Sequence, residues 1–139
     1  MMVYQQQFRY PTHGRGTYEI TAEVEQHIKA SQIQTGICTV FIHHTSASLV
    51  ITENADPTVR HDLETIMQRL APDADPAYQH DYEGDDDMSA HVRCVLTNDS
   101  LTIPVSNGHS ALGTWQGVFV YEHRSNPFQR QLTITVIGD

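Results

Sequence analysis

The sequence predicts an α+β fold: a single β-sandwich-like domain with mixed or antiparallel sheets and two or three helices. Two runs, 37–44 and 115–123, are apolar on both faces, which is typical of strands buried between two layers. Strand-like and helical runs do not alternate one by one, so we do not expect a doubly wound parallel sheet. The 139 residues contain no repeat or linker, and we expect one domain, 1–139, large enough to bury a hydrophobic core.

The N-terminal part of the chain predicts four strands and one helix. β-branched and aromatic residues predict strands at 3–10 and 17–20. Apolar side chains then recur every four positions, which predicts a short amphipathic helix over 20–31. The doubly apolar run 37–44 and the alternating run 47–53 predict the next two strands.

The middle of the chain predicts two helices joined by a loop. Asp56 is a good N-cap, and Pro57 fits the first helical position, where its missing N–H costs nothing. An apolar stripe over 59–70 continues this helix, and a loop rich in Asp and Pro follows at 72–87. Helical spacing of apolar residues returns over 88–96.

The last part of the chain predicts three strands, at 101–105, 115–123 and 131–137. The turn signal Asn107-Gly108 closes the first of these strands. The predicted order of elements is therefore β-β-α-β-β-α-α-β-β-β.

The charge balance excludes several classes of partner. Lys and Arg total 8 against 17 Asp and Glu, a formal net charge of -9, so binding to nucleic acid through phosphate contacts is not expected. An anionic membrane surface would repel the chain for the same reason, and no apolar run is long enough to span a bilayer. The first ten residues lack the features of a signal peptide, so we expect a cytoplasmic protein, with Cys38 and Cys94 reduced and buried.

Histidine is the residue type that the composition singles out. The chain has 9 His but a single lysine, Lys29, in the polar part of a predicted helix, so covalent amine catalysis is not expected. The sequence contains no phosphate-binding glycine loop, dinucleotide motif, serine-hydrolase motif or HExxH motif. The composition therefore points to imidazole chemistry, either metal binding or proton transfer.

Three histidines are the candidate metal ligands. His44 ends a predicted strand, His80 lies in the acidic loop, and His91 lies on the apolar stripe of the following helix. Three neutral imidazoles with an open position are typical of a catalytic zinc site. The alternatives are a polar strand end for His43 and His44 and a hydrogen-bonded core histidine for His91. We interpret the acidic run 85–87 as a solvated face.

Carboxylates collect near two predicted strand ends. Glu53 closes an otherwise apolar strand face and needs a partner, a metal or a function, whereas Asp56 has a capping role. Glu53 could instead accept backbone hydrogen bonds at the corner between strand and helix. Gln116, Glu122 and Arg124 share one strand face, where Glu122 and Arg124 could form an ion pair or hold an anionic substrate.

Several segments together resemble the YjbQ family. The run 36–59 (GICTVFIHHTSASLVITENADPTV) carries the main likeness, and the H-x-x-E-G pattern at 80–84, the AHVR stretch at 90–93 and the GTWQG motif at 113–117 with its Glu122 add to it. The likeness extends from about residue 17 to the last strand. The four segments in this order are more specific for the YjbQ family than any one of them alone.

The resemblance implies a compact α+β domain with a β-sandwich core that assembles as a homotrimer, with sites at or near the subunit interfaces. The family is labelled a secondary thiamine-phosphate synthase, an auxiliary activity. The family pattern commonly has Asn after the Glu-Gly pair, where this chain has Asp85. Carried over by position, the functional set is His44, Glu53, His80, Glu83, His91, Gln116 and Glu122.

Two hypotheses about function follow. In the first, the chain is a thiamine-phosphate synthase-type transferase: His44, His80 and His91 bind one divalent ion, zinc or magnesium, beside a small phosphorylated substrate. The metal would stabilise the departing pyrophosphate, and Glu53 would act as general acid or base. In this hypothesis the catalytic set is completed by Glu83, Gln116 and Glu122. In the second, the chain is a non-catalytic trimeric protein that holds a metal or a small anion.

Overall fold

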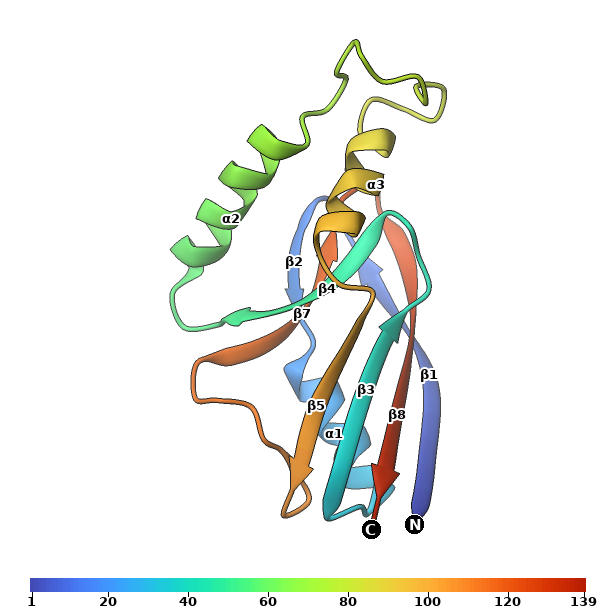
Figure 1. The fold of residues 1–139 in the computed structure, drawn as a ribbon, viewed down its shortest axis with the longest axis vertical. Coiled ribbons are helices and arrows are strands. Elements are labelled where there is room, and N and C mark those ends of the chain that lie inside the picture. The colour runs from blue at the N-terminus through green and yellow to red at the C-terminus, as the bar shows by residue number, and fades with distance from the viewer.

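The structure, a computed structural model, describes all residues, 1–139, and contains eight strands and three helices (Figure 1). The predicted order of elements is confirmed, with one two-residue strand, β6, added by the hairpin at Asn107-Gly108. Both turn residues have positive φ, 53° and 77°, as the tight turns of such hairpins require. In chain order the elements are β1 (Met2–Thr12), β2 (Gly16–Glu19), α1 (Thr21–Ser31), β3 (Thr35–Ile42), β4 (Ala47–Glu53), α2 (Pro57–Leu70), α3 (Asp87–Leu96), β5 (Ser100–Ser106), β6 (His109–Ser110), β7 (Gln116–Glu122) and β8 (Phe128–Gly138).

Two antiparallel sheets curl around one core. The larger sheet has the order β1-β8-β3-β5-β6 and the smaller sheet has the order β2-β7-β4. The prediction of an α+β domain with antiparallel sheets is confirmed, but the second layer is not a full sheet. The strands of the smaller sheet have at most 7 residues against 11 in β1 and β8, so they cover only the upper part of the larger sheet. Helix α1 covers the lower part (Figure 1).

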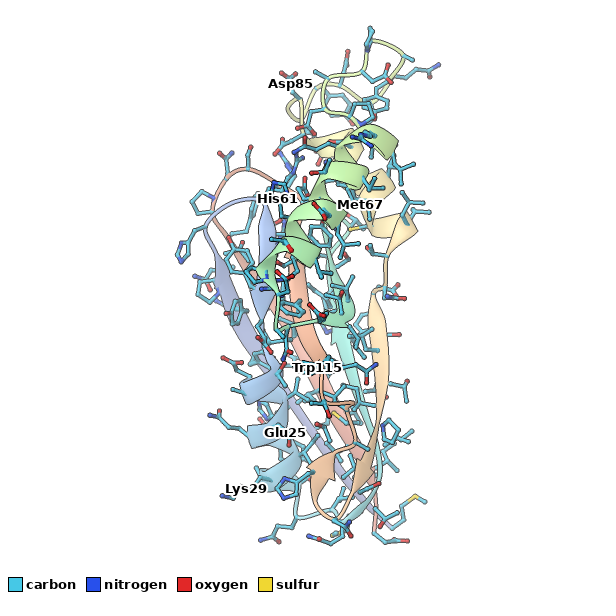
Figure 2. The ribbon with its side chains drawn as sticks, turned by 90° about the vertical axis from the view of Figure 1, so that its left-hand side faces the viewer. Glu25, Lys29, His61, Met67, Asp85 and Trp115 are labelled. Atoms are coloured by element: carbon cyan, nitrogen blue, oxygen red, sulfur yellow. The ribbon has the colours of Figure 1, made fainter.

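The core lies between these layers and is almost entirely aliphatic. Alternate residues of β5 and β8 point inward, and α1 contributes the apolar face that its four-residue spacing predicts. Burial of each such side chain stabilises the fold by about 1.5–3 kcal/mol. Lys29, the only lysine, extends from the exposed side of α1, at the opposite end of the molecule from Asp85 in the acidic loop (Figure 2).

The two strands that are apolar on both faces differ in how they are covered. β7 is buried on both faces, as predicted, because α2 lies over its outer side: Arg60 stacks on the Phe119 ring at 4.9 Å, and the Tyr121 hydroxyl donates to Glu64. In β3 the prediction holds for one face only. Ile37 and Phe41 on the outer face are 46% and 39% exposed, because no element of the chain covers that side of the larger sheet.

Helix α2 begins where the sequence predicts but buries none of its residues. Asp56 Oδ1 accepts a hydrogen bond from the Thr58 backbone N–H at 2.9 Å, so the capping role is confirmed. The apolar stripe at Leu63, Ile66 and Leu70 is 39–60% exposed, because α2 contacts the smaller sheet through Arg60 and Glu64 instead (Figure 1). None of the three helices combines the length and hydrophobicity that crossing a bilayer requires.

Candidate metal centre and its pocket

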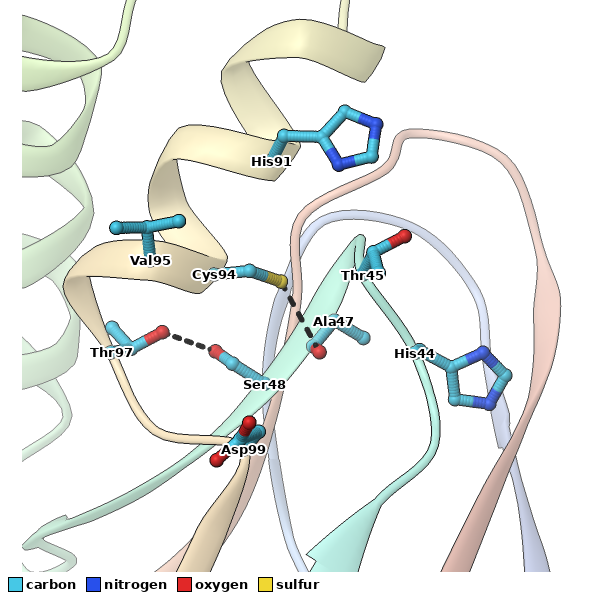
Figure 3. Close-up of a pocket in the computed structure, with 9 residues that line it drawn as sticks. All are labelled: His44, Thr45, Ala47, Ser48, His91, Cys94, Val95, Thr97 and Asp99. Carbon is cyan, nitrogen blue, oxygen red and sulfur yellow. Dashed lines mark hydrogen bonds between the residues drawn. The ribbon is translucent and has the colours of Figure 1, made fainter.

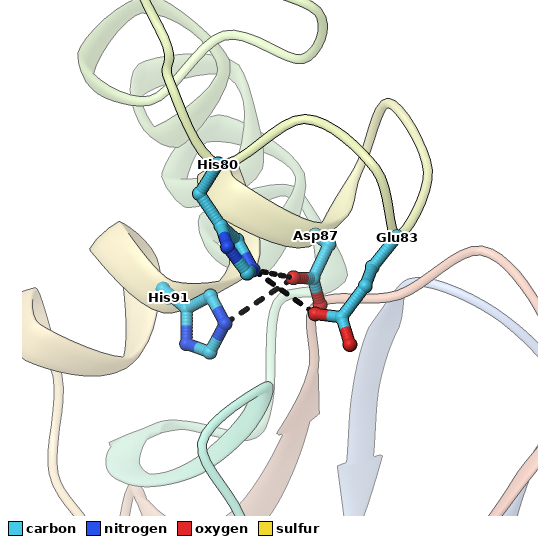
Figure 4. A group of neighbouring side chains, drawn as sticks. All are labelled: His80, Glu83, Asp87 and His91. Atoms are coloured by element: carbon cyan, nitrogen blue, oxygen red, sulfur yellow. Dashed lines mark hydrogen bonds and ion pairs between the residues drawn. The ribbon is translucent and has the colours of Figure 1, made fainter.

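Four side chains converge at the start of α3 (Figure 4). Asp87 and His91 stand one turn apart on the helix, and His80 and Glu83 come from the loop that precedes it. Their nearest ligand atoms all lie within 4.8 Å of one another. We call these four residues the quartet.

The contacts inside the quartet leave too few protons for the acceptors present. His80 Nε2 lies 2.8 Å from Asp87 Oδ2 and 3.0 Å from Glu83 Oε2, and His91 Nε2 lies 3.3 Å from the same Asp87 oxygen. Each imidazole nitrogen carries one hydrogen at most, so His80 cannot donate well to both carboxylates. A cation at the centre would satisfy all four groups together.

The donor set fits a divalent metal ion. Two imidazoles with carboxylates are ordinary ligands for zinc, and a tetrahedral ion with ligands about 2.1 Å away separates its ligand atoms by about 3.4 Å. The three contacts within the quartet measure 2.8 to 3.3 Å, and all four ligand atoms lie within 4.8 Å of one another, so small adjustments of the side chains would reach that geometry. The side chains of His80 and His91 remain 33% and 34% exposed, which leaves a side of the centre open to a further ligand.

Arg124 fixes the position of the buried carboxylate of Asp87. Its Nη1 donates to Asp87 Oδ1 at 2.8 Å and its Nη2 donates to the Glu83 carbonyl at 2.9 Å. Asp87 is only 4% exposed, so this charge requires a fixed partner. The neighbouring Asp86 accepts from the backbone and hydroxyl of Ser125, which ties the loop to the β7–β8 connection. Asp87 Oδ2 thus stays available to the two histidines.

A second arginine anchors the other end of the acidic loop. Arg15 donates through Nη1 and Nη2 to the two carboxylate oxygens of Asp73, both at 2.8 Å, and through Nε and Nη2 to the His123 carbonyl. The Ser89 hydroxyl of α3 also donates to Asp73. The hydrogen bonds from Arg15 are the main reason that the pKa of Asp73 is lowered. The segment that carries His80 and Glu83 is therefore held at both ends.

A pocket adjoins the quartet and shares His91 with it (Figure 3). Its volume is about 460 Å³, enough for a small molecule. Residues of the β3–β4 connection, β4 and α3 form most of its wall. Burial raises the pKa of the Cys94 thiol in this wall to about 12, so the thiol stays protonated and is a poor nucleophile.

Ser48 in the same wall contacts His123, but the pair is not an activated nucleophile. The Ser48 hydroxyl lies 2.8 Å from His123 Nε2 and 2.6 Å from the Thr97 hydroxyl, and Ser48 is only 1% exposed. Burial, with further effects of nearby arginines, lowers the pKa of His123 to about 3. Such an imidazole is neutral at physiological pH and is a weak base, so we assign the pair a structural role.

His44, the third predicted metal ligand, lies in the wall of the pocket and not in the quartet. Its Nε2 accepts a hydrogen bond from the Gln131 backbone N–H at 2.7 Å, and its Nδ1 lies 3.4 Å from Nη1 of Arg130. One nitrogen is therefore occupied and the other faces a cation, so neither can take a metal ion in this arrangement.

Glu122 is buried in an ion pair with a different arginine from the one that the sequence suggests. Arg130 donates through Nε and Nη2 to the two carboxylate oxygens, and the Thr12 hydroxyl and two backbone N–H groups donate to the same carboxylate. The side chain of Arg124 turns instead to Asp86 and Asp87. Glu122 is fully buried and fully hydrogen-bonded, which suits a structural role better than proton transfer.

Glu53 and Gln116 lie at the opposite end of the smaller sheet. They pair with each other in the β4–β7 ladder, whereas Glu122 pairs with Ala47 six positions away, about 20 Å at 3.3 Å per residue. The Glu53 carboxylate accepts from the Asp56 backbone N–H at 3.1 Å, which is the corner role considered as the alternative. The Gln116 side chain accepts from the Gly113 N–H at 2.7 Å. Within one chain neither residue reaches the quartet.

Asp87 is the one residue of the quartet that the sequence motifs do not indicate. The acidic run 85–87 was expected to be a solvated face, which is wrong for Asp87 because the helix start turns its carboxylate inward toward Arg124 and the histidines. A signal was present: Asp87 and His91 are four residues apart at the start of a predicted helix, so their side chains share one face.

The quartet predicts a specific pH dependence of stability in the metal-free protein. The hydrogen bond with Asp87 is the main reason that the pKa of His80 is raised above its ordinary value of 6.5. The pair therefore stabilises the fold fully below that value, and the contribution is lost as the pH rises through the raised pKa. In EDTA, the difference in melting temperature between wild type and Asp87→Asn should be larger at pH 6 than at pH 9.

The contact of Asp87 with Arg124 does not change over this range, since arginine stays charged. Thermal melts of both proteins at several pH values measure the difference. If the difference in melting temperature between the two proteins is the same at every pH, the His80–Asp87 pair does not form.

Comparison with known proteins identifies the family. The YjbQ family model, described as "UPF0047 protein YjbQ-like", matches residues 6–139. A UPF0047 protein of Synechocystis is 46% identical over 128 residues, which cover 92% of this chain and 87% of that protein. The UPF0047 protein YjbQ of Escherichia coli is 39% identical over 139 residues, 99% of this chain and 100% of that protein.

Solved structures agree with this assignment. A crystal structure of a YbjQ-like protein of unknown function from Sulfolobus solfataricus matches with a TM-score of 0.91 at 25% identity, covering 99% of both chains. A conserved hypothetical protein from Thermus thermophilus matches with a TM-score of 0.84 at 32% identity, covering 95% of this chain and 99% of that one. The chain belongs to the YjbQ (UPF0047) family, whose function is unknown.

Proposed function

We propose that this chain binds one divalent metal ion through the quartet and uses it to hold a small phosphorylated molecule in the adjoining pocket. The observation that carries the proposal is the convergence of two imidazoles and two carboxylates within 4.8 Å, with His91 shared between this centre and the pocket. Imidazole ligands favour zinc over magnesium, which prefers oxygen ligands and bound water.

The charge of the chain supports a metal in this role. A net charge of -9 disfavours a phosphorylated ligand unless a cation is added locally. The two arginines closest to the acidic loop, Arg15 and Arg124, already pair with carboxylates and have little charge to offer. A metal ion would supply a Lewis acid for phosphoryl oxygens, while Arg124 keeps the Asp87 carboxylate in place.

The candidate reaction is a thiamine-phosphate synthase-type transfer. A ring nitrogen of a thiazole phosphate would form a C–N bond to a pyrophosphate-activated pyrimidine, and the broken C–O bond would leave its electron pair on the departing pyrophosphate. The main requirement is to stabilise the leaving group, which suits a site with metal ligands. Glu53 lies at the far end of the smaller sheet and Glu122 is held in its ion pair with Arg130. The absence of these two predicted carboxylates from the quartet favours the second candidate, a binding protein without turnover.

The metal prediction concerns affinity and its ligands. Wild-type protein, stripped with EDTA and made without a His-tag, should bind one zinc ion per chain in equilibrium dialysis. His91→Ala and Asp87→Asn should each weaken binding by at least about tenfold, because each removes a ligand. The affinity should fall as the pH falls, because the raised pKa of His80 makes protons compete for its Nε2.

His13→Ala is the matched control, since His13 is exposed and lies outside the quartet. Full zinc occupancy in His91→Ala would reject the ligand assignment.

Turnover separates the two candidate functions. With the two thiamine precursors as substrates, the transferase hypothesis predicts zinc-dependent release of pyrophosphate that is lost in Asp87→Asn. Release of pyrophosphate can be followed with a coupled phosphate assay. Zinc binding without any pyrophosphate release would leave the binding protein as the function.

We also propose that the chain assembles as a homotrimer, the assembly that the YjbQ resemblance implies. The exposed stripe of α2 and the uncovered outer face of β3 support an interface, because both are apolar surfaces that the single chain leaves in water. Light scattering should therefore give the mass of three chains of 15.7 kDa.

Ile66→Asp should weaken the trimer, because it places a charge in the stripe. Gln68→Asp adds the same charge to another face of α2 and should leave the mass unchanged. A stable monomer of the wild type at micromolar concentration would contradict the proposal.

A further inference from the structure

A second polar feature lies beside the pocket, where His44, which lines the pocket, meets the buried Arg130 behind it. Arg130 is 3% exposed, and its guanidinium stacks on the Phe128 ring at 4.3 Å. The Nε and Nη2 groups of Arg130 donate hydrogen bonds to the Glu122 carboxylate, and Nη2 also lies 3.4 Å from the Ser46 carbonyl oxygen. The polar contact of Nη1 is His44 Nδ1 at 3.4 Å.

The hydrogen bond to Gln131 determines which nitrogen of His44 carries the proton. A backbone N–H can only donate, and this one lies 2.7 Å from His44 Nε2, so Nε2 must accept. Burial, together with the charge of Arg130, lowers the pKa of His44, so the ring is neutral at physiological pH. The single ring proton of a neutral imidazole must then lie on Nδ1.

It follows that two donors face each other without an acceptor. The Nδ1–H of His44 and the Nη1–H of Arg130 are 3.4 Å apart, and neither can accept from the other. Arg130 is buried and His44 is half-buried. Donors in such positions are almost always satisfied by protein, water or ligand, so an oxygen atom belongs beside this pair. His44 lines the pocket, so that oxygen can come from a molecule bound there.

We propose that His44 Nδ1–H and Arg130 Nη1–H form an oxyanion subsite that binds a phosphoryl oxygen of the pocket's ligand. The choice of a phosphoryl group rests on the proposed function, whereas the paired donors do not depend on it. Both groups suit a charged acceptor, because arginine is cationic and bonds from charged groups are the stronger ones. Asp99 in the same pocket opposes a free anion, so we expect inorganic phosphate to bind weakly, with a Kd on the order of millimolar.

Two measurements on zinc-free protein in EDTA test the subsite without involving the quartet. Long-range ¹H–¹⁵N NMR of the imidazoles identifies the tautomer of His44. Titration with inorganic phosphate, followed on the His44 signals and by calorimetry, measures binding. Because NMR reports on the wild type, the test does not depend on whether an Arg130 variant folds.

A matched pair of substitutions separates the two nitrogens of His44. His44→Asn can place an amide N–H near the Nδ1 position, and His44→Gln can place an amide oxygen near the Nε2 position. His44→Asn should change the Kd for phosphate by no more than about threefold. His44→Gln should weaken phosphate binding by about tenfold, because it loses one charge-assisted hydrogen bond. His43→Gln is the control, since His43 is bonded to the Thr133 hydroxyl and should bind phosphate as the wild type does.

The expected result is an Nδ1–H tautomer whose signals shift on adding phosphate. An Nε2–H tautomer, unchanged binding in His44→Gln, or no binding at 10-fold the expected Kd, about 10 mM, would overturn the inference and leave water as the occupant. Zinc binding by the wild type, measured separately, tests the quartet. If the wild type binds no zinc, the metal proposal is rejected, but the conclusion about the N–H donors of His44 and Arg130 is unaffected.

Discussion

The architecture of the site depends on one buried carboxylate, that of Asp87. Its Oδ1 is held by Arg124 from the β7–β8 connection, and its Oδ2 faces both histidines of the quartet. A charge that is 4% exposed is tolerated only with good partners, so the acidic loop, α3 and the β7–β8 connection must come together around it. The same bonds that stabilise the buried charge leave its Oδ2 facing both histidines, which is the arrangement that the proposed metal site requires.

Four of the eight positively charged residues of this acidic protein are held in ion pairs in the interior. Arg15, Arg93, Arg124 and Arg130 all have side chains less than 20% exposed, and each pairs with a carboxylate. Their charges are therefore used to hold the framework of the site. In our proposals, a ligand with phosphate groups is therefore bound by a metal ion in the quartet and by the N–H groups of His44 and Arg130.

Local sequence signals were enough for the elements, but the site depends on contacts between distant segments. Asp56 and Asn107-Gly108 act through their own neighbours, so the helix start and the turn were predictable. His44 illustrates the limit: the Gln131 backbone N–H that occupies its Nε2 lies 87 residues away, and no spacing rule indicates it. Trp115 begins the run 115–123 that was expected to be a strand buried on both faces, but it is 63% exposed because it lies in the loop before β7 begins.

The most direct test of the account is the position of a bound ion. Crystals of the metal-free protein soaked in zinc and measured at the zinc absorption edge would show the ion by its anomalous scattering. The account predicts one strong peak within about 2.0–2.2 Å of His80 Nε2, His91 Nε2 and an Asp87 oxygen. A peak beside His44, or none at the start of α3 while zinc binds elsewhere, would contradict it.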